Sequence, residues 1–216
     1  HEVREVETPD RILCYGGKYY TINLDPYANT DVEDAYNYGS INWAVDDDNL
    51  YAVIRLDYQD AIHHYFLRGR IQEDGITLSD TGFKFAEPGV PDSWTKGGIT
   101  GANGITDATA RGGNLYFLYC QRHDSKTETR GFLYKIPDAS MNNSSAAVSL
   151  SGWEKEESRI PEGGPMGNKL YNPLRFVAVK PKKLYIADGG FSNTNSQGSN
   201  SDMNRIMVFD LFNSSS

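Results

Sequence analysis

The feature that most constrains this chain is an internal repeat of strand-like segments. Each repeat has an apolar run, a tight polar turn, a second apolar run that opens with Leu-Tyr, a polar gap and a third apolar run. The Leu-Tyr pairs begin at Leu50, Leu115 and Leu184. Their spacing of about 65–70 residues exceeds the roughly 40–50 residues of a common propeller blade, and the excess lies in the gaps. A strand meander repeated in tandem is typical of β-propellers.

The nine apolar runs are expected to be strands that are covered on both faces. They are apolar at successive positions and not only at alternate ones, whereas a sheet with one solvated face shows clean alternation. Weaker fourth strands are expected in 77–85 and 146–153, and an N-terminal hairpin in 12–15 and 19–24 across Gly16-Gly17. The nine runs are 41–45, 50–54 and 65–71, then 104–108, 115–119 and 131–136, then 175–179, 184–187 and 205–209.

The third repeat carries a family resemblance. Pro173 precedes the run Phe176-Val177-Ala178-Val179, which Leu184-Tyr185-Ile186-Ala187-Asp188 and Asn204-Arg205-Ile206-Met207-Val208-Phe209-Asp210 follow. The segment 173–210 resembles the NHL repeat, although the insertion 189–203 replaces a short turn and the other repeats have Tyr119 and Ile54 where Asp188 aligns. The resemblance implies blades around a central tunnel, with recognition commonly at one face.

The expected fold is therefore all-β, with three to four blades of a β-propeller. The blade-like units are 12–40 in part, 41–98, 99–172 and an incomplete 173–216. Propellers close with at least about 4 blades, so we expect the chain to belong to a larger propeller of about six. Missing ordered segments and closure by a partner chain are the alternatives.

Composition excludes several classes of function. The net charge is −8 and no Lys/Arg cluster exceeds a triplet, so the chain lacks the basic face that nucleic acid or an anionic membrane requires. No apolar run reaches the roughly 20 residues of a membrane span. Cys14 and Cys120 are expected to be buried free thiols, with a bridge as the alternative. The Ser-rich end, the acidity and the absence of an initiating Met favour an exported protein: periplasmic, secreted or at the cell surface.

Few residues have the pattern of a metal or cofactor site. Asp46-Asp47-Asp48-Asn49 could offer oxygens to Ca²⁺, but these residues are also typical of a tight turn, which is favoured. His63 and His64 would point to opposite faces of a strand, so one ion could not bind both. His63 and His123 lie in corresponding gaps and could meet on one rim of a propeller. No cofactor motif is present in the chain.

The leading hypothesis is a non-catalytic scaffold that binds a protein or a carbohydrate. The gaps 57–62, 121–129 and 189–203 join the second and third strands of each repeat, so they should lie at one end of the fold, where loops on a rigid scaffold commonly bind ligands. The candidate contacts are His63, Arg122, His123, Trp94 as an exposed anchor, and Asp188. For Asp188, a structural pair with Arg205 is the favoured role.

The alternative is a metal-dependent hydrolase or lyase of the lactonase kind, with its site at the tunnel mouth. Such a site needs carboxylates, Asn or His that converge from the innermost strands. Only Asn42, Asp107 and Arg175 are available there, and this scarcity ranks the enzyme second.

Overall fold

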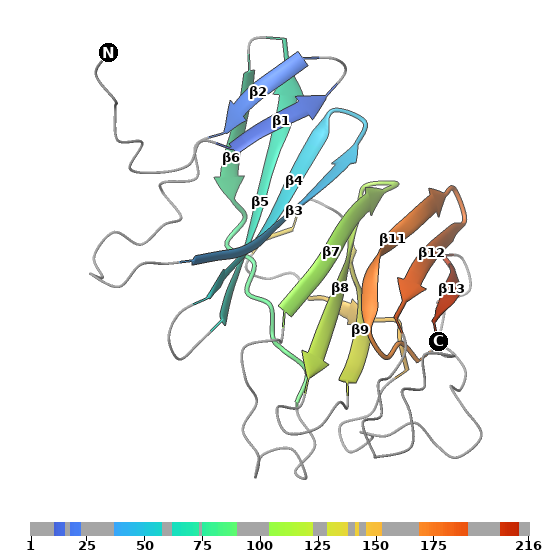
Figure 1. Ribbon diagram of the computed structural model, residues 1–216. Helices are drawn as coiled ribbons and strands as arrows, with labels where there is room; N and C mark the ends of the chain where they lie inside the picture. Colours follow the sequence, from blue (N-terminus) through green and yellow to red (C-terminus); the bar gives the residue numbers. More distant parts are fainter. Residues whose placement is uncertain are drawn as a thin grey trace, which may run out of the picture.

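The structure, a computed structural model, contains only β-strands as regular secondary structure in the part of the chain that it describes (Figure 1). That part comprises residues 11–15, 18–22, 37–57, 62–73, 75–89, 104–122, 129–137, 141–142, 146–152, 169–189 and 204–211. The strands are β1 (Arg11–Tyr15), β2 (Lys18–Ile22), β3 (Asn37–Asp46), β4 (Asn49–Asp57), β5 (Ile62–Gln72), β6 (Gly75–Asp80), β7 (Gly104–Arg111), β8 (Asn114–Arg122), β9 (Thr129–Ile136), β10 (Val148–Ser149), β11 (Pro173–Lys180), β12 (Lys183–Asp188) and β13 (Arg205–Asp210).

Strands β3 to β13 form three antiparallel meanders, one from each repeat, and β1 and β2 form a separate hairpin. The first sheet is β3-β4-β5-β6, the second is β7-β8-β9-β10 and the third is β11-β12-β13. All nine expected strands are confirmed, as are the hairpin β1-β2 and a fourth strand in the first two sheets. The third sheet has no fourth strand among the described residues.

The fourth strands are shorter than expected. β6 ends at Asp80, because the Asp80 carboxylate accepts the backbone N–H of Gly82 at 2.8 Å and Gly82 has a φ of 71°. That local bond replaces a ladder bond and turns the chain out of the sheet. β10 is only two residues long, and Trp153 lies outside the described residues.

The turns between first and second strands follow the chemistry of their residues. Asp47 has a φ of 51°, and the Asn49 side chain donates to the carbonyl of Asp46 at 3.4 Å. The turn interpretation of the acidic segment 46–49 is thereby confirmed. The corresponding turn of the second sheet places Gly112 and Gly113 at φ values of 58° and 75°, the backbone that a two-residue hairpin turn requires.

The central strands β4 and β8 of the first two sheets are buried on both faces, as the apolar runs predict, whereas the third sheet is buried on one face only and the prediction is wrong there. On β8, Leu115, Phe117 and Tyr119 pack into the core shared with the first sheet, while Tyr116 and Leu118 pack into the core shared with the third. On β4, Leu50 to Ile54 are all at most 1 % exposed. Alternate side chains of a strand point to opposite faces, so a strand of this composition needs a neighbour on each side.

The three sheets stand side by side with their first strands adjacent. β3 contacts β7, and β7 contacts β11 (Figure 1). The Asn42 amide donates to the carbonyl of Ile105 at 3.4 Å, and the Thr106 hydroxyl donates to the carbonyl of Pro173 at 2.9 Å. Side-chain to backbone bonds therefore connect successive first strands, in addition to the apolar cores between the sheets.

Candidate functional site

The candidate site is the end of the sheets at which the long polar gaps begin and finish. In the strand registers Asp57 pairs with Asn37, Cys120 with Gly104 and Asp188 with Pro173. The second strand of each sheet thus ends beside the start of the first strand, and the first strands lie next to one another (the lower end in Figure 1). We call this the loop end; the residues that join these strand ends lie outside the described part.

The structure places the predicted site residues unevenly. His63 lies in β5 and Arg122 at the end of β8, both at the loop end, and their side chains are not described. His123 and Trp94 lie outside the described residues. Asp188 ends β12 at the base of the third gap and is 1 % exposed.

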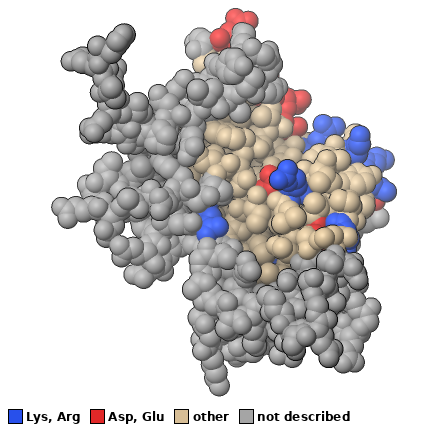
Figure 2. Space-filling model, in the orientation of Figure 1, with Lys and Arg blue, Asp and Glu red and all other residues tan. Residues whose placement is uncertain are grey.

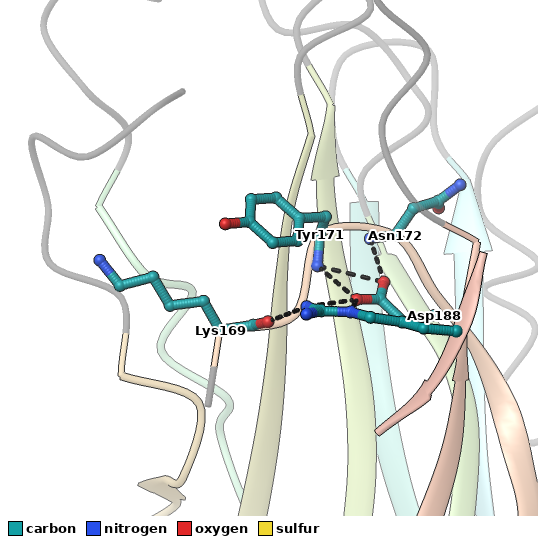
Figure 3. A network of polar contacts seen from close by, with 5 residues as sticks. Lys169, Tyr171, Asn172 and Asp188 are labelled. Carbon is teal, nitrogen blue, oxygen red and sulfur yellow. Dashed lines mark hydrogen bonds and ion pairs between the residues drawn. The ribbon is translucent and has the colours of Figure 1, made fainter. Parts of the chain in front are cut away.

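The Asp188 carboxylate is the centre of a polar network (Figure 3). One oxygen, Oδ1, accepts the backbone N–H of Asn172 at 2.7 Å and that of Tyr171 at 3.1 Å. The other, Oδ2, accepts Nη2 and Nε of Arg205 at 3.0 and 3.1 Å. The expected pair between the second and third strands is confirmed, and it also fixes the segment that leads into β11.

Arg205 extends this network to the segment before β11. Its Nη2 donates to the carbonyl of Lys169 at 2.5 Å, and its guanidinium lies 5.3 Å from the centre of the Tyr171 ring. A buried carboxylate that accepts this many hydrogen bonds holds the strands around it. Asp188 belongs to the segment that resembles the NHL repeat, and its bonds hold β13 and the segment before β11 against β12.

The second sheet has a corresponding pair at the base of its own gap. Gln121 and Arg130 face each other across β8 and β9, and Arg130 Nη2 donates to Gln121 Oε1 at 2.7 Å. Arg130 also donates to the carbonyl of Gly89, and Gln121 Nε2 donates to the carbonyl of Pro88 at 2.6 Å. Both side chains are 1 % exposed, so they fix the segment 81–89 against the second sheet.

The segment 81–89 brings a carboxylate to the boundary between the first two sheets. Glu87 Oε1 lies 3.8 Å from Nδ1 of the buried His64 side chain, whose Nε2 accepts the backbone N–H of Ile105 at 3.4 Å. The Glu87 side chain is 41 % exposed. An accessible carboxylate therefore lies over a buried imidazole at the loop end, and a ligand that offers hydrogen-bond donors could contact it.

The tyrosines beneath Glu87 are held in the neutral form. Burial raises the pKa of Tyr119 far above its ordinary value, and the nearby Glu87 carboxylate adds to the shift. Burial likewise raises the pKa of Tyr134 to about 12, against the opposing effect of Arg130. Neither phenol is poised to ionise near neutral pH, so they act as packing and not as general bases.

Sequence reasoning missed Glu87, Gln121 and Arg130. Glu87 lies in a stretch that reads only as a connection, and its neighbours in space come from strands far along the chain. Arg130 did carry a signal, because a charged residue beside an apolar run that is buried on both faces needs a partner. The partner, the backbone of 88–89, could not be inferred from spacing.

The three residues considered for a tunnel-mouth site occupy one equivalent position. Each of them pairs with the residue three positions after the Leu of its repeat's Leu-Tyr pair: Asn42 with Val53, Asp107 with Leu118 and Arg175 with Ala187. Asn42 bonds to the second sheet as described above, and Asp107 Oδ2 accepts the backbone N–H of Phe176 in the third at 2.7 Å. Two of the three side chains therefore connect neighbouring sheets.

The burial of Asp107 beside the third sheet can be tested through the pH dependence of stability. Burial raises its pKa above the ordinary value of 3.8, although the amides of Phe176 and Ala108 and the charge of Arg175 oppose the shift. A raised pKa in the folded state means that protonation stabilises the fold, and this contribution is lost as the pH rises through that pKa.

We therefore expect Asp107→Asn to gain stability relative to the unsubstituted chain as the pH rises. The difference between the two free energies of unfolding, measured with urea between about pH 3 and pH 7, should move in favour of the Asn variant. A difference that stays constant, or that moves in favour of Asp107, contradicts the conclusion that burial raises the pKa of Asp107 in the folded state.

Comparison with known proteins adds nothing to these residues. No family model, curated protein or solved structure matches the chain. The likeness to the NHL repeat therefore rests on the residues of the segment 173–210 alone.

Three further findings concern only the described residues. They bring no group of three His, Cys, Asp or Glu side chains together as a metal ion would require. They also include no helix with the length and apolar character of a membrane span. Within the same residues, Cys120 is buried and is not part of a disulfide.

Proposed function

We propose that the chain is part of a β-propeller and acts as a non-catalytic scaffold that binds a protein or a carbohydrate at its loop end. The observation that carries the proposal is that the second strands of all three sheets end beside the starts of their first strands, at one end of the array. The three long polar gaps open from these positions. Loops on a rigid support are the usual place of recognition.

Two features of the site support this proposal. The Asp188–Arg205 and Gln121–Arg130 pairs close the bases of two gaps with buried, charge-assisted hydrogen bonds. A base fixed in this way reduces the ordering that ligand binding costs. The exposed carboxylate of Glu87 lies beside His64 of the first sheet and can accept hydrogen bonds from a ligand.

The test is to shorten the gaps and to compare binding. In three variants the segments 58–61, 123–128 and 190–203 are replaced in turn by short Gly-Asn linkers. The probes are an array of immobilised glycans and an array of immobilised purified proteins. Shortening at least one gap should weaken a bound spot by about tenfold or more, equivalent to about 1.4 kcal/mol.

The matched control changes the opposite end of the sheets. Replacing Pro181-Lys182 by Asn-Gly alters the turn between β11 and β12 and should leave the same spot unchanged. Equal loss in this control, unchanged binding in all three shortened variants, or no bound spot on either array would contradict the proposal.

A further inference from the structure

The outward face of the third sheet is apolar and exposed. Two rows of side chains cross it in register: Arg175, Ala187 and Ile206 form one, and Ala178, Tyr185 and Val208 form the other. Ile206 is 54 % exposed and Val208 is 49 % exposed. Adjacent exposed apolar residues on a sheet face mark an interaction surface.

The equivalent rows of the other two sheets are covered by the next sheet. Ile206 corresponds to Phe66 in the first sheet and to Leu133 in the second. Each of them pairs with the residue that lies three positions after the Leu of the Leu-Tyr pair in the second strand. Phe66 and Leu133 are both 0 % exposed. The third sheet thus has the surface that the first two use to bind a following sheet.

The polar member of the row supports the same conclusion. Asn42 and Asp107 each bond to the backbone of the following sheet, whereas Arg175, at the equivalent position, is exposed. A guanidinium there can donate to the backbone carbonyls of a further first strand. The surface is therefore shaped for another sheet of the same kind.

Charge identifies the sheet that fits. The turn between β11 and β12 carries the exposed residues Lys180, Lys182 and Lys183. Figure 2 shows Lys and Arg atoms gathered at the upper right, the side on which Figure 1 places this turn. The turn between β3 and β4 carries Asp46, Asp47 and Asp48. Corresponding turns of successive sheets meet, since Asp46 Oδ2 accepts the backbone N–H of Gly113 at 2.7 Å. The first sheet of another molecule would bring its acidic turn to this basic one.

The N-terminal hairpin is also complementary to the third sheet. β2 contacts β6, the strand at the outer edge of the first sheet. If another sheet packed before the first sheet in the array, its outer strands would lie at this same place. The third sheet ends at β13 among the described residues and has an open edge there. On the same face of the first sheet β4 is already covered, but Ile41, Trp43 and Val45 on β3 are only partly buried. A third sheet could thus pack on β3 while its edge receives the hairpin.

We propose that two copies of this chain associate head to tail, with the third sheet of each packed on the first sheet and hairpin of the other. The proposal rests on the propeller arrangement proposed above, and it closes two sets of three sheets into one ring of six. Closed symmetric dimers are the commonest oligomers, and closure covers the apolar face and the edge of β13.

The mass of the 216-residue chain in sedimentation equilibrium tests this association. We expect a species of twice 24.1 kDa. Ile206→Gln should raise the dimer dissociation constant by about tenfold or more, since it places an amide in an apolar contact. Val148→Gln is the matched control, because Val148 on β10 is 47 % exposed and lies outside the face.

A charge reversal distinguishes a second copy from any other occupant. Lys183→Glu and Asp48→Lys should each weaken the dimer, and the double variant should restore it, because its new Glu and Lys face each other across the interface. A monomer at concentrations up to about 100 µM, a dimer that Ile206→Gln leaves unchanged, or a double variant without restoration would overturn the proposal. Ligand binding at the loop end can be measured on a monomer, so its failure is a separate result.

Discussion

Gly131→Ala is expected to lower the free energy of unfolding by about 3 kcal/mol, at the upper end of the usual cost of overpacking. Gly131 lies in β9 where the segment before β11 crosses it, and its backbone N–H donates to the carbonyl of Leu170 at 2.9 Å. A Cβ at this position would lie 2.2 Å from Cδ of Pro173 and 3.0 Å from Cβ of Leu170. A proline ring and a Cβ cannot rotate away, so the contact between the second and third sheets has to open.

Urea unfolding followed by tryptophan fluorescence measures this loss. Gly104→Ala is the matched control, because its Cβ would lie 2.9 Å from Arg55, but only from the flexible end of that side chain. The control should lose about 1 kcal/mol or less, because the flexible Arg55 side chain can move away from the added Cβ at little cost. Equal losses in the two variants would show that close approach of the sheets at Gly131 is not a determinant of stability.

The strands could be predicted because their signal is local. Leu115 to Tyr119 form an uninterrupted apolar run, and only a strand with a sheet on each side buries such a run. The close approach at Gly131 could not be predicted, because it depends on a segment about 40 residues further along the chain. The end of β6 has a local cause, the bond between the Asp80 carboxylate and the backbone N–H of Gly82, which the apolar pattern does not reveal.

The candidate site shows the same division between local and distant signals. The Asp188–Arg205 pair could be predicted because both residues belong to a repeat motif whose strands are adjacent. The grouping of His64, Glu87 and Arg130 could not, because the segment 81–89 crosses from the first sheet to the second. Buried polar residues in apolar runs, such as Gln121 and Arg130, mark where such crossings occur, although they do not identify the partner.

The Asp188–Arg205 network connects stability with the proposed function. Asp188 ends one side of the longest gap and Arg205 begins the other, so the pair sets the distance between the ends of that loop. A loop with fixed ends samples fewer conformations before it binds. Loss of the pair should therefore affect both the third sheet and any ligand that the loop contacts.

Asp188→Ala is accordingly expected to lower the free energy of unfolding by about 3 kcal/mol, the usual cost of breaking a buried ion pair from one side. The substitution leaves Arg205 and the backbone N–H groups of Tyr171 and Asn172 without their acceptor. Asp188→Asn keeps the shape and one acceptor oxygen, so it should lose less than Ala. Asp210→Ala, an exposed carboxylate at the other end of β13, should change stability by no more than about 1 kcal/mol.

Urea unfolding measures the three stabilities, and amide hydrogen exchange locates the change. Exchange should accelerate first in Tyr171, Asn172 and β13, because these groups are held by the lost carboxylate and not by the core between the first two sheets. A loss in Asp188→Ala no larger than in Asp210→Ala would show that the network is dispensable. Exchange that accelerates equally in β4 and β13 would instead mean that the three sheets unfold as one unit, with the Asp188 pair contributing to all of them.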